Sequence, residues 1–143
     1  MPKILLAVDG SPHALRTAKK LIQNAAWYRE PPKVQLLYVH LPVPEVHGLH
    51  HVVSRDALHR FYKEEGETAL KACRKLMERA RIPYEAEIDV GQVAQTIVNR
   101  ARKSGCDMIY MGTHGMTAME NMLLGSVATK VLHLSPIPVV LVH

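Results

Sequence analysis

The sequence is poor in cysteine and aromatic residues, and no hydrophobic run in it approaches the length of a membrane span. Its two cysteines, Cys73 and Cys106, form no CxxC pair, which excludes a disulfide framework and a CxxC redox or zinc motif. We expect both in the core rather than as reactive thiols. One Phe and one Trp do not supply the stacking platforms of proteins that bind single-stranded nucleic acid. With no signal-peptide pattern at the N-terminus, we expect a cytoplasmic protein that binds neither nucleic acid nor membrane.

Size and charge are those of an ordinary globular domain. The 143 residues are 48% hydrophobic and 22% charged, which predicts one folded domain over residues 1–143. The net charge of +5 comes from basic residues that are spread along the expected helices rather than gathered in one run. Solvated helix faces explain these residues better than a nucleic-acid surface does.

Apolar runs and breakers divide the chain into alternating strands and helices. The run at 3–8 is typical of a buried strand, and Ser11 and Pro12 are suited to the cap and first position of a helix that follows. Further elements are expected as a strand at 34–39, a helix from about 55 to 80, a strand at 84–90, a helix from 93 that ends at Gly105, a strand at 107–111, a helix at 126–133 and a strand at 138–142. This alternation predicts an α/β fold with a mainly parallel, doubly wound sheet and helices on both faces.

Two of these elements carry finer expectations. In the long helix, Ser54 is the expected cap, and Gly66 weakens the middle enough that a break there is expected as an alternative to a continuous helix. The core face predicted for this helix comprises Ala57, Leu58, Phe61, Tyr62, Ala69, Cys73, Leu76 and Met77. The strand at 84–90 alternates apolar and acidic residues, which indicates an edge strand with one wetter face.

A glycine-punctuated loop between the strand at 107–111 and the helix at 126–133 is the most informative segment. It reads Gly112, two residues, Gly115, nine residues, then Gly125 and Ser126. Glycines let a backbone approach a ligand closely, and a helix N-terminus offers unpaired N–H groups to an anion. We expect Ser126 to cap the helix and contact phosphate. The alternative is that the glycines only end the strand and the serine only caps the helix.

The turn after the first strand carries the other candidate group, Asp9. In a doubly wound sheet this turn and the glycine loop are neighbours where the strand order reverses. Asp9 would there hold a ribose hydroxyl or a phosphate-bound Mg²⁺. A turn-forming aspartate that bonds its own backbone is an equally good interpretation of the residue taken alone.

Motifs of efficient nucleotide chemistry are missing. No lysine follows Gly125 and Ser126 as a P-loop requires, and the turn at Asp9 is not a G-x-G-x-x-G fingerprint. His114 is the nearest candidate base, but a histidine between glycines is more often a solvated or phosphate-bonding residue. We predict no catalytic residue, and at most slow ATP hydrolysis.

The segments MPKILLAVDGSPHA, LLYVH and MGTHGMTAMENMLLGSVATKVLHLSPIPVVLV resemble the universal stress protein family, and the resemblance covers the whole chain. In that family the Gly-x₂-Gly-x₉-Gly-Ser/Thr spacing marks the members that bind ATP. The resemblance implies a five-stranded, Rossmann-like parallel sheet in the order 3-2-1-4-5. It also implies a homodimer through the last strand, which begins at Pro138 and ends at Val142.

The resemblance further implies where ATP, with or without Mg²⁺, would bind. Adenine would lie near Val39, ribose near Asp9 and Gly112, and phosphates near Gly115 and the start of the last helix. The full predicted site is Ala7, Val8, Asp9, Val39, Met111, Gly112, His114, Gly115, Gly125, Ser126, Val127 and Ala128, with Asp9 as the Mg²⁺ ligand.

The chain departs from many ATP-binding members by having Met116 and Ala118 where they carry Arg and Gly. This removes a cation near the phosphates, so that either the affinity falls or another base such as His114 or Lys130 compensates. We interpret one group of residues as a variable loop near the pocket mouth rather than as a metal site: His47, His50, His51 and His59 with Glu45. We expect the methionines to be core or pocket residues: Met111, Met116, Met119 and Met122. Met119 and Met122 are alternatively exposed, where they would form a partner surface.

Three hypotheses follow. The preferred one is a homodimeric ATP-binding module in which nucleotide shifts the populations of two forms and so the choice of an unidentified protein partner. The alternatives are a weak Mg²⁺-dependent ATPase and a nucleotide-free dimeric scaffold.

Overall fold

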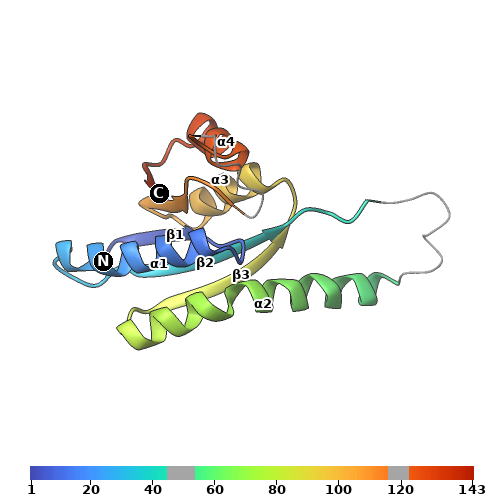
Figure 1. Ribbon diagram of the computed structural model, residues 1–143, viewed down its shortest axis with the longest axis horizontal. Coiled ribbons are helices and arrows are strands. Elements are labelled where there is room, and N and C mark those ends of the chain that lie inside the picture. Colours follow the sequence, from blue (N-terminus) through green and yellow to red (C-terminus); the bar gives the residue numbers. More distant parts are fainter. Residues whose placement is uncertain (45–53, 116–122) are drawn as a thin grey trace.

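The computed structural model of the chain describes residues 1–44, 54–115 and 123–143 (Figure 1). The strands are β1 (Lys3–Ala7), β2 (Lys33–His40), β3 (Tyr84–Val90), β4 (Met108–Gly112) and β5 (Val139–Val142). The helices are α1 (Pro12–Asn24), α2 (Arg55–Ala80), α3 (Val93–Lys103) and α4 (Ser126–Leu134), with a short 3₁₀ turn, η1 (Ala25–Trp27), after α1. In these described residues no helix is both long and apolar enough to cross a membrane.

The five strands form one parallel sheet in the order β3-β2-β1-β4-β5, which confirms the predicted fold. β1 lies in the centre, where Leu6 is opposite Leu36 of β2 and Leu5 is opposite Ile109 of β4. The chain moves outward from β1 to one side through β2 and β3, and to the other side through β4 and β5. The strand order therefore reverses between β1 and β4, and the carboxyl ends of these two strands border the same crevice.

The two faces of the sheet carry separate apolar cores. On one face Ile4 and Leu6 pack under α1 and α2 together with Leu21, Leu70 and Met77. On the other face Leu5 packs under α3 and α4 together with residues such as Ile97 and Val131. Adjacent β1 residues serve opposite faces because successive side chains in a strand alternate in direction. Cys73 and Cys106 are buried in these cores, as expected, and burial followed by the charge of Asp9 raises the pKa of the Cys73 thiol to about 11.

Helix α2 confirms the expected long helix capped by Ser54 and is continuous through Gly66, which excludes the alternative of a break there; Gly66 is buried because β3 passes closely beside it. The predicted core face was wrong at the start of the helix, where Phe61 is exposed, and it missed Leu70, which is fully buried. The first turns of α2 extend past the end of the sheet (Figure 1), so apolar residues there have no sheet to cover.

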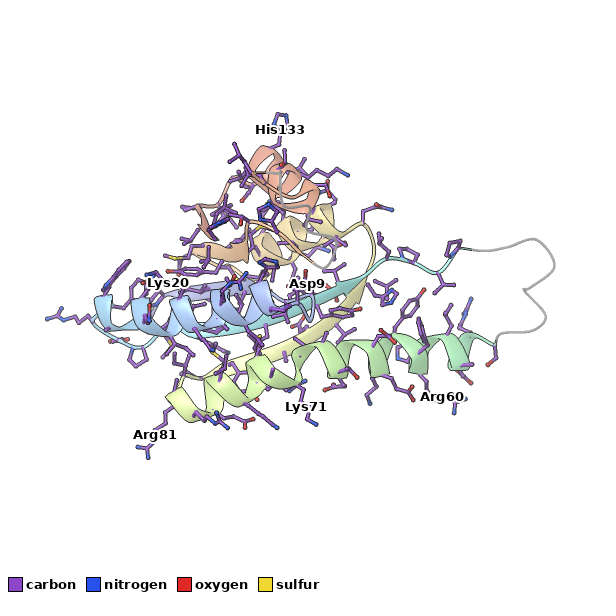
Figure 2. The ribbon with its side chains drawn as sticks, viewed as in Figure 1. Asp9, Lys20, Arg60, Lys71, Arg81 and His133 are labelled. Atoms are coloured by element: carbon purple, nitrogen blue, oxygen red, sulfur yellow. The ribbon has the colours of Figure 1, made fainter. Side chains whose placement is uncertain are left out.

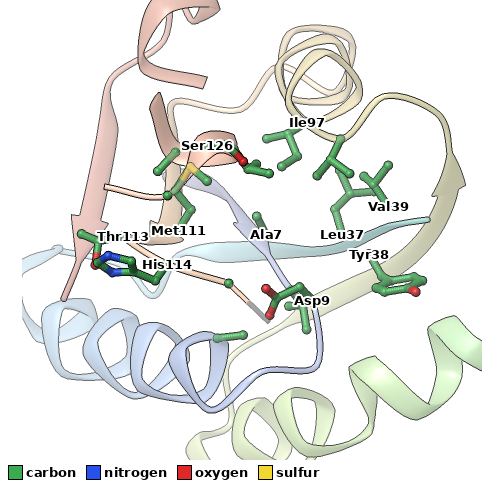
Figure 3. A pocket seen from close by; sticks show the side chains of 18 of the residues that line it. Ala7, Asp9, Leu37, Tyr38, Val39, Ile97, Met111, Thr113, His114 and Ser126 are labelled. Carbon is green, nitrogen blue, oxygen red and sulfur yellow. The ribbon is translucent and has the colours of Figure 1, made fainter. Parts of the chain in front are cut away.

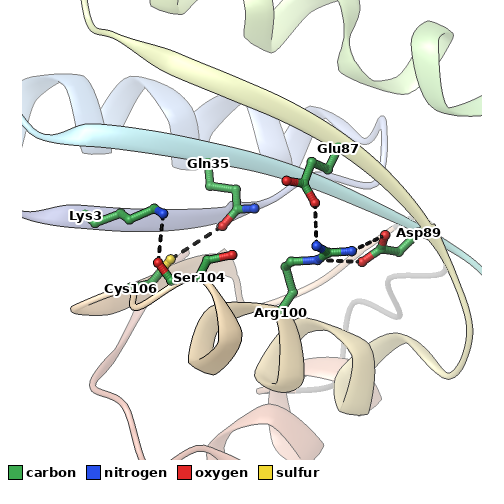
Figure 4. Close-up of polar contacts among 7 residues, drawn as sticks. All are labelled: Lys3, Gln35, Glu87, Asp89, Arg100, Ser104 and Cys106. Carbon is green, nitrogen blue, oxygen red and sulfur yellow. Dashed lines mark hydrogen bonds and ion pairs between the residues drawn. The ribbon is translucent and has the colours of Figure 1, made fainter.

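The edge strand β3 is held to α3 by charge rather than by apolar packing. Arg100 of α3 donates hydrogen bonds to both carboxylate oxygens of Asp89, at 3.0 and 2.7 Å, and lies 2.9 Å from Glu87 (Figure 4). The hydrogen bonds with Asp89, and then the charges of both acids, raise the pKa of Arg100 despite its partial burial. The acidic residues that predicted a wetter face of β3, Glu87 and Asp89, are therefore the residues that bind Arg100 of α3.

Candidate functional site

A cavity of about 680 Å³ opens at the carboxyl ends of β1, β2 and β4, where the strand order reverses (Figure 3). This volume is in the range of small-molecule sites. Every residue of the predicted site lines it: Ala7, Val8, Asp9, Val39, Met111, Gly112, His114, Gly115, Gly125, Ser126, Val127 and Ala128. The structure therefore brings these residues together around one cavity, while their contact with a nucleotide stays a prediction.

One end of the cavity is apolar. Leu37 and Val39 of β2 line it together with Ile97 of α3 and Met111 of β4 (Figure 3). Val93 of α3 is a further lining residue. Sequence reasoning named Val39 and Met111 but missed the other three. Leu37 could have been found, because it lies two residues before Val39 and so faces the same side of the strand. These side chains make a surface suited to a flat, weakly polar ring.

The other end of the cavity is formed by backbone. The chain bends at Thr113 directly after β4, and we call residues 112–115 the glycine turn. Gly125 is joined to it by a 2.6 Å hydrogen bond from its N–H to the carbonyl of Thr113. A Cβ on Gly125 would lie 3.2 Å from that carbonyl oxygen, so only glycine fits without displacing the turn. Glycine is therefore required at 125 because of the hydrogen bond to Thr113, which joins the two ends of the loop beside the cavity.

The N-terminus of α4 faces the same end. Its cap is Gly125, in extended conformation, and Ser126 is the first helical residue with no capping bond, so the predicted capping role of Ser126 was wrong. A cap residue needs the extended conformation that Gly125 already has. The carbonyl of Gly125 accepts instead from the N–H and the hydroxyl of Thr129, at 3.0 and 2.9 Å. The N–H groups of the first turn are those that a helix leaves for an anion.

Asp9 lies between the two ends of the cavity. Its Oδ1 accepts a 2.9 Å hydrogen bond from the N–H of Ser11, which is the turn-forming role that the sequence offered as one interpretation. Its Oδ2 faces Gly115, where a Cβ would approach to 2.6 Å. The turn-forming role and the ligand-binding role of Asp9 are therefore compatible, because Oδ1 stabilises the turn after β1 while Oδ2 lies beside Gly115.

The cavity rim near β2 carries an aromatic group that the sequence analysis did not single out. Tyr38 and His40 line the rim, and the His40 ring lies 5.5 Å from Phe61 and 5.1 Å from Tyr62 between centroids. Burial, and then the charges of Glu65 and Asp9, raise the pKa of Tyr38. Tyr38 therefore stays a neutral hydrogen-bonding group at physiological pH.

The lining has little charge. Among its described residues Asp9 is an acid, His40 and His114 are histidines, and none is Lys or Arg. Lys130, one expected substitute for a phosphate-binding cation, is exposed on α4 and is not part of the lining. The departure at Met116 and Ala118, and the placement of Met119 and Met122, lie outside the described residues.

In the parts of the chain that the structure describes, no group of three or more His, Cys, Asp or Glu is arranged to hold a metal ion. Glu45, His47, His50 and His51 lie outside the described residues, and His59 is exposed on α2. A single carboxylate such as Asp9 fits Mg²⁺ only when phosphates supply further oxygen ligands, which is the usual mode for nucleotide-bound Mg²⁺.

Comparisons of the sequence and of the structure with known proteins point to the same family. The chain matches the model of the universal stress protein family over residues 1–143. A universal stress protein of Methanocaldococcus jannaschii is 36% identical over 140 residues, which cover 98% of this chain and 81% of that protein. One from Thermus aquaticus is 34% identical, with 98% of this chain and 97% of the relative covered. The solved structure of a second M. jannaschii protein has a TM-score of 0.80 at 29% identity, covering 98% of this chain and 94% of that one.

Two other structures of similar fold contain nucleotides. An Arabidopsis thaliana protein of this family was solved with AMP bound; it has a TM-score of 0.69 at 16% identity and covers 99% of this chain and 91% of its own. A universal stress protein solved in complex with cAMP has a TM-score of 0.63 at 20% identity, covering 99% of this chain and 96% of its own. At these identities the likeness shows the fold, and the nucleotides belong to those proteins.

Proposed function

The chain belongs to the universal stress protein family, and from this premise we propose that it is an ATP-binding member that acts as a homodimer in the response to stress. The observation that supports this most is the convergence of an apolar pocket, a carboxylate, a glycine turn and a helix N-terminus on one open cavity. These four features match the base, ribose and phosphates of a nucleotide in that order along the cavity. The nucleotides in two structures of the same fold support the adenylate class.

In the proposed complex, adenine lies between Val39 and Ile97, whose side chains exclude water from both faces of the ring. Asp9 and the backbone of Gly112 receive the ribose. The phosphates lie at Gly115, Gly125 and the first turn of α4, where N–H groups and the positive end of the helix dipole stabilise negative charge. Mg²⁺, when bound, supplies further positive charge between Asp9 and the phosphates.

The homodimer is proposed through β5, extended by Pro138. β5 is an edge strand whose residues are all half-buried, and it presents one row of backbone groups beyond β4. Such an edge is a template for pairing with another strand.

ATP with Mg²⁺ is expected to raise the melting temperature of the purified protein. A ligand that binds only the folded state at 100 times its Kd adds about 2.7 kcal/mol of stability. For a domain of this size that is a rise of about 5–10 °C. Thermal unfolding with ATP, ADP, AMP, cAMP and GTP measures it, and chromatography of the nucleotide released from protein as isolated identifies the ligand. No rise with any adenylate would contradict nucleotide binding and favour the scaffold hypothesis.

Asp9→Asn is expected to remove the Mg²⁺ dependence of ATP binding. Asparagine keeps an oxygen for the Ser11 N–H but loses the charge that attracts a cation. With Mg²⁺ the variant should bind ATP about tenfold more weakly than the native protein, since one ion pair near the surface contributes on the order of 1–2 kcal/mol. In EDTA it should bind at least as tightly, because no carboxylate then repels the phosphates. Calorimetry with and without Mg²⁺ measures both, and equal Mg²⁺ dependence in the two proteins would exclude Asp9 as the ligand.

A further inference from the structure

Three histidines from separate parts of the chain meet behind the glycine turn. His13 lies in the first turn of α1, His114 follows β4 and His143 follows β5. The ring centroid of His114 is 6.0 Å from that of His13 and 6.0 Å from that of His143. Figure 3 shows His114 turned toward Thr113. We call His13, His114 and His143 the histidine cluster.

Thr113 connects this cluster to the proposed phosphate site. Its main-chain N–H donates to the carbonyl of Val142 at 3.0 Å, and its carbonyl accepts from Gly125 at 2.6 Å. Its Oγ1 lies 2.9 Å from Nδ1 of His114 and 3.2 Å from Nδ1 of His143. Thr113 is 8% exposed, so the protein rather than solvent surrounds its hydroxyl group.

The Thr113 hydroxyl is compatible with neutral and with protonated histidines. A hydroxyl has one hydrogen and two lone pairs. Beside two neutral rings it donates to one Nδ1 and accepts from the other, and beside two protonated rings it accepts from both. Protonation therefore adds positive charge behind the glycine turn without removing the contacts that hold Thr113.

Among the described residues, charged groups near the histidine cluster come from α1 and from the loop after β1. From α1, Arg16 lies within hydrogen-bonding distance of Nδ1 of His13, and its guanidinium can only donate in this contact. Lys20 of α1 lines the same hollow as His143. From the loop after β1, Oδ2 of Asp9 faces Gly115. β4 and β5 carry no charged residue. In the part of the chain that the structure describes, these neighbours are two cations from α1 and one carboxylate beside Gly115.

Resting on the proposed nucleotide site, we propose that the histidine cluster couples phosphate binding to proton uptake and supplies the positive charge that the cavity lining lacks. Gly112 is the point of contact, because a Cβ there would lie 3.4 Å from Cβ of His13. Phosphates bound at the glycine turn bring several negative charges close to rings that change charge between pH 5 and 8. The complex then holds more protons than the free protein does.

The direction of the pH effect follows from linkage. When the bound state holds more protons than the free state, affinity rises as pH falls. Uptake of one proton strengthens binding by at most tenfold per pH unit, so we expect ATP to bind about tenfold more tightly at pH 6 than at pH 8.

Calorimetry of ATP binding at pH 6, 7 and 8, in buffers of different ionisation enthalpy, measures both the affinity and the number of protons taken up. The test variant is His13→Gln with His143→Gln, which keeps hydrogen-bonding capacity but removes two titrating rings. The matched control is His133→Gln, an exposed histidine on α4 outside the cluster (Figure 2). Titration of the nucleotide itself is common to all three proteins and cancels in the comparison.

The expected result is that the double variant binds ATP at pH 8 like the native protein but loses most of the gain at pH 6, while His133→Gln keeps it. Equal proton uptake in all three proteins would overturn the role of the histidine cluster and leave the proposed function standing. No ATP binding by the native protein at any pH would instead overturn both. If the double variant does not fold, the imidazole proton resonances of the native protein decide: ATP should raise the titration midpoints of two or more histidines, and unchanged midpoints would contradict the proposal.

Discussion

Gly115→Val is expected to reduce ATP affinity at least about 100-fold while leaving the protein folded. A Cβ at this position would lie 2.6 Å from Oδ2 of Asp9, so the valine side chain fills the space between the carboxylate and the turn. Phosphates approaching the backbone would lose about two hydrogen bonds to charged groups, on the order of 3 kcal/mol, which corresponds to about 100-fold in Kd. Isothermal calorimetry with ATP and Mg²⁺ measures the loss.

The fold should tolerate this change. Among the described residues the glycines with positive φ are Gly10 and Gly105, so the backbone at Gly115 is accessible to valine. The unfolding free energy should stay within about 1 kcal/mol of the native value, as for most changes outside the core. Retained ATP affinity in this variant would contradict the placement of the phosphates.

A second variant separates the two consequences of the valine. Gly115→Val combined with Asp9→Ala removes the carboxylate that the new side chain displaces. If the double variant binds ATP more weakly than Asp9→Ala alone, the valine blocks the phosphates directly. Equal affinity in these two variants would show that displacement of Asp9 caused the loss, and the phosphate path would then have to avoid Gly115.

Gly66→Leu is expected to destabilise the protein by about 2 kcal/mol and to lower its melting temperature by about 4–8 °C. A Cβ on Gly66 would lie 2.9 Å from Cγ2 of Ile88 and closer still to its Cγ1 and Cδ1, so α2 and β3 must separate or repack. This overpacking outweighs the gain of about 1 kcal/mol in helix propensity when glycine is replaced. Thermal and urea unfolding measure the net effect.

The control for this prediction is Thr68→Leu, at an exposed position two residues along the same helix. It should change stability by less than about 0.5 kcal/mol. Adding Ile88→Ala to Gly66→Leu should recover part of the loss, with a coupling of about 1 kcal/mol or more between the two positions. A Gly66→Leu protein as stable as the native one would show that α2 and β3 are not in close contact.

The elements and the cavity could be predicted from the sequence because they depend on local patterns. Ser11 caps α1 and Pro12 begins it, since cap chemistry acts within one helical turn. The acidic alternation of β3 correctly indicated an edge strand. Gly112, Gly115 and Gly125, which the spacing singled out, all line the cavity. The strand order itself came from the family resemblance rather than from any periodicity.

Predictions failed where the outcome depended on a neighbour that is distant in sequence. Gly66 looked like a weak point of a helix, and its burial against Ile88 could not be read from α2 alone. Phe61 fits the apolar stripe of α2, yet it is exposed, since it lies beside His40 at the very end of β2. Ser126 was expected to cap α4, but the cap is Gly125, whose N–H donates to the carbonyl of the distant Thr113.

By itself, then, the sequence determined the alternating elements, the parallel α/β class and the loop that borders the cavity, because hydrophobic period and glycine spacing act over a few residues. Tertiary structure alone decided that His13, His114 and His143 meet around Thr113, and that α2 needs glycine where β3 passes. Those contacts join residues far apart in the chain, and their geometry is set by how helices and strands pack rather than by any local preference.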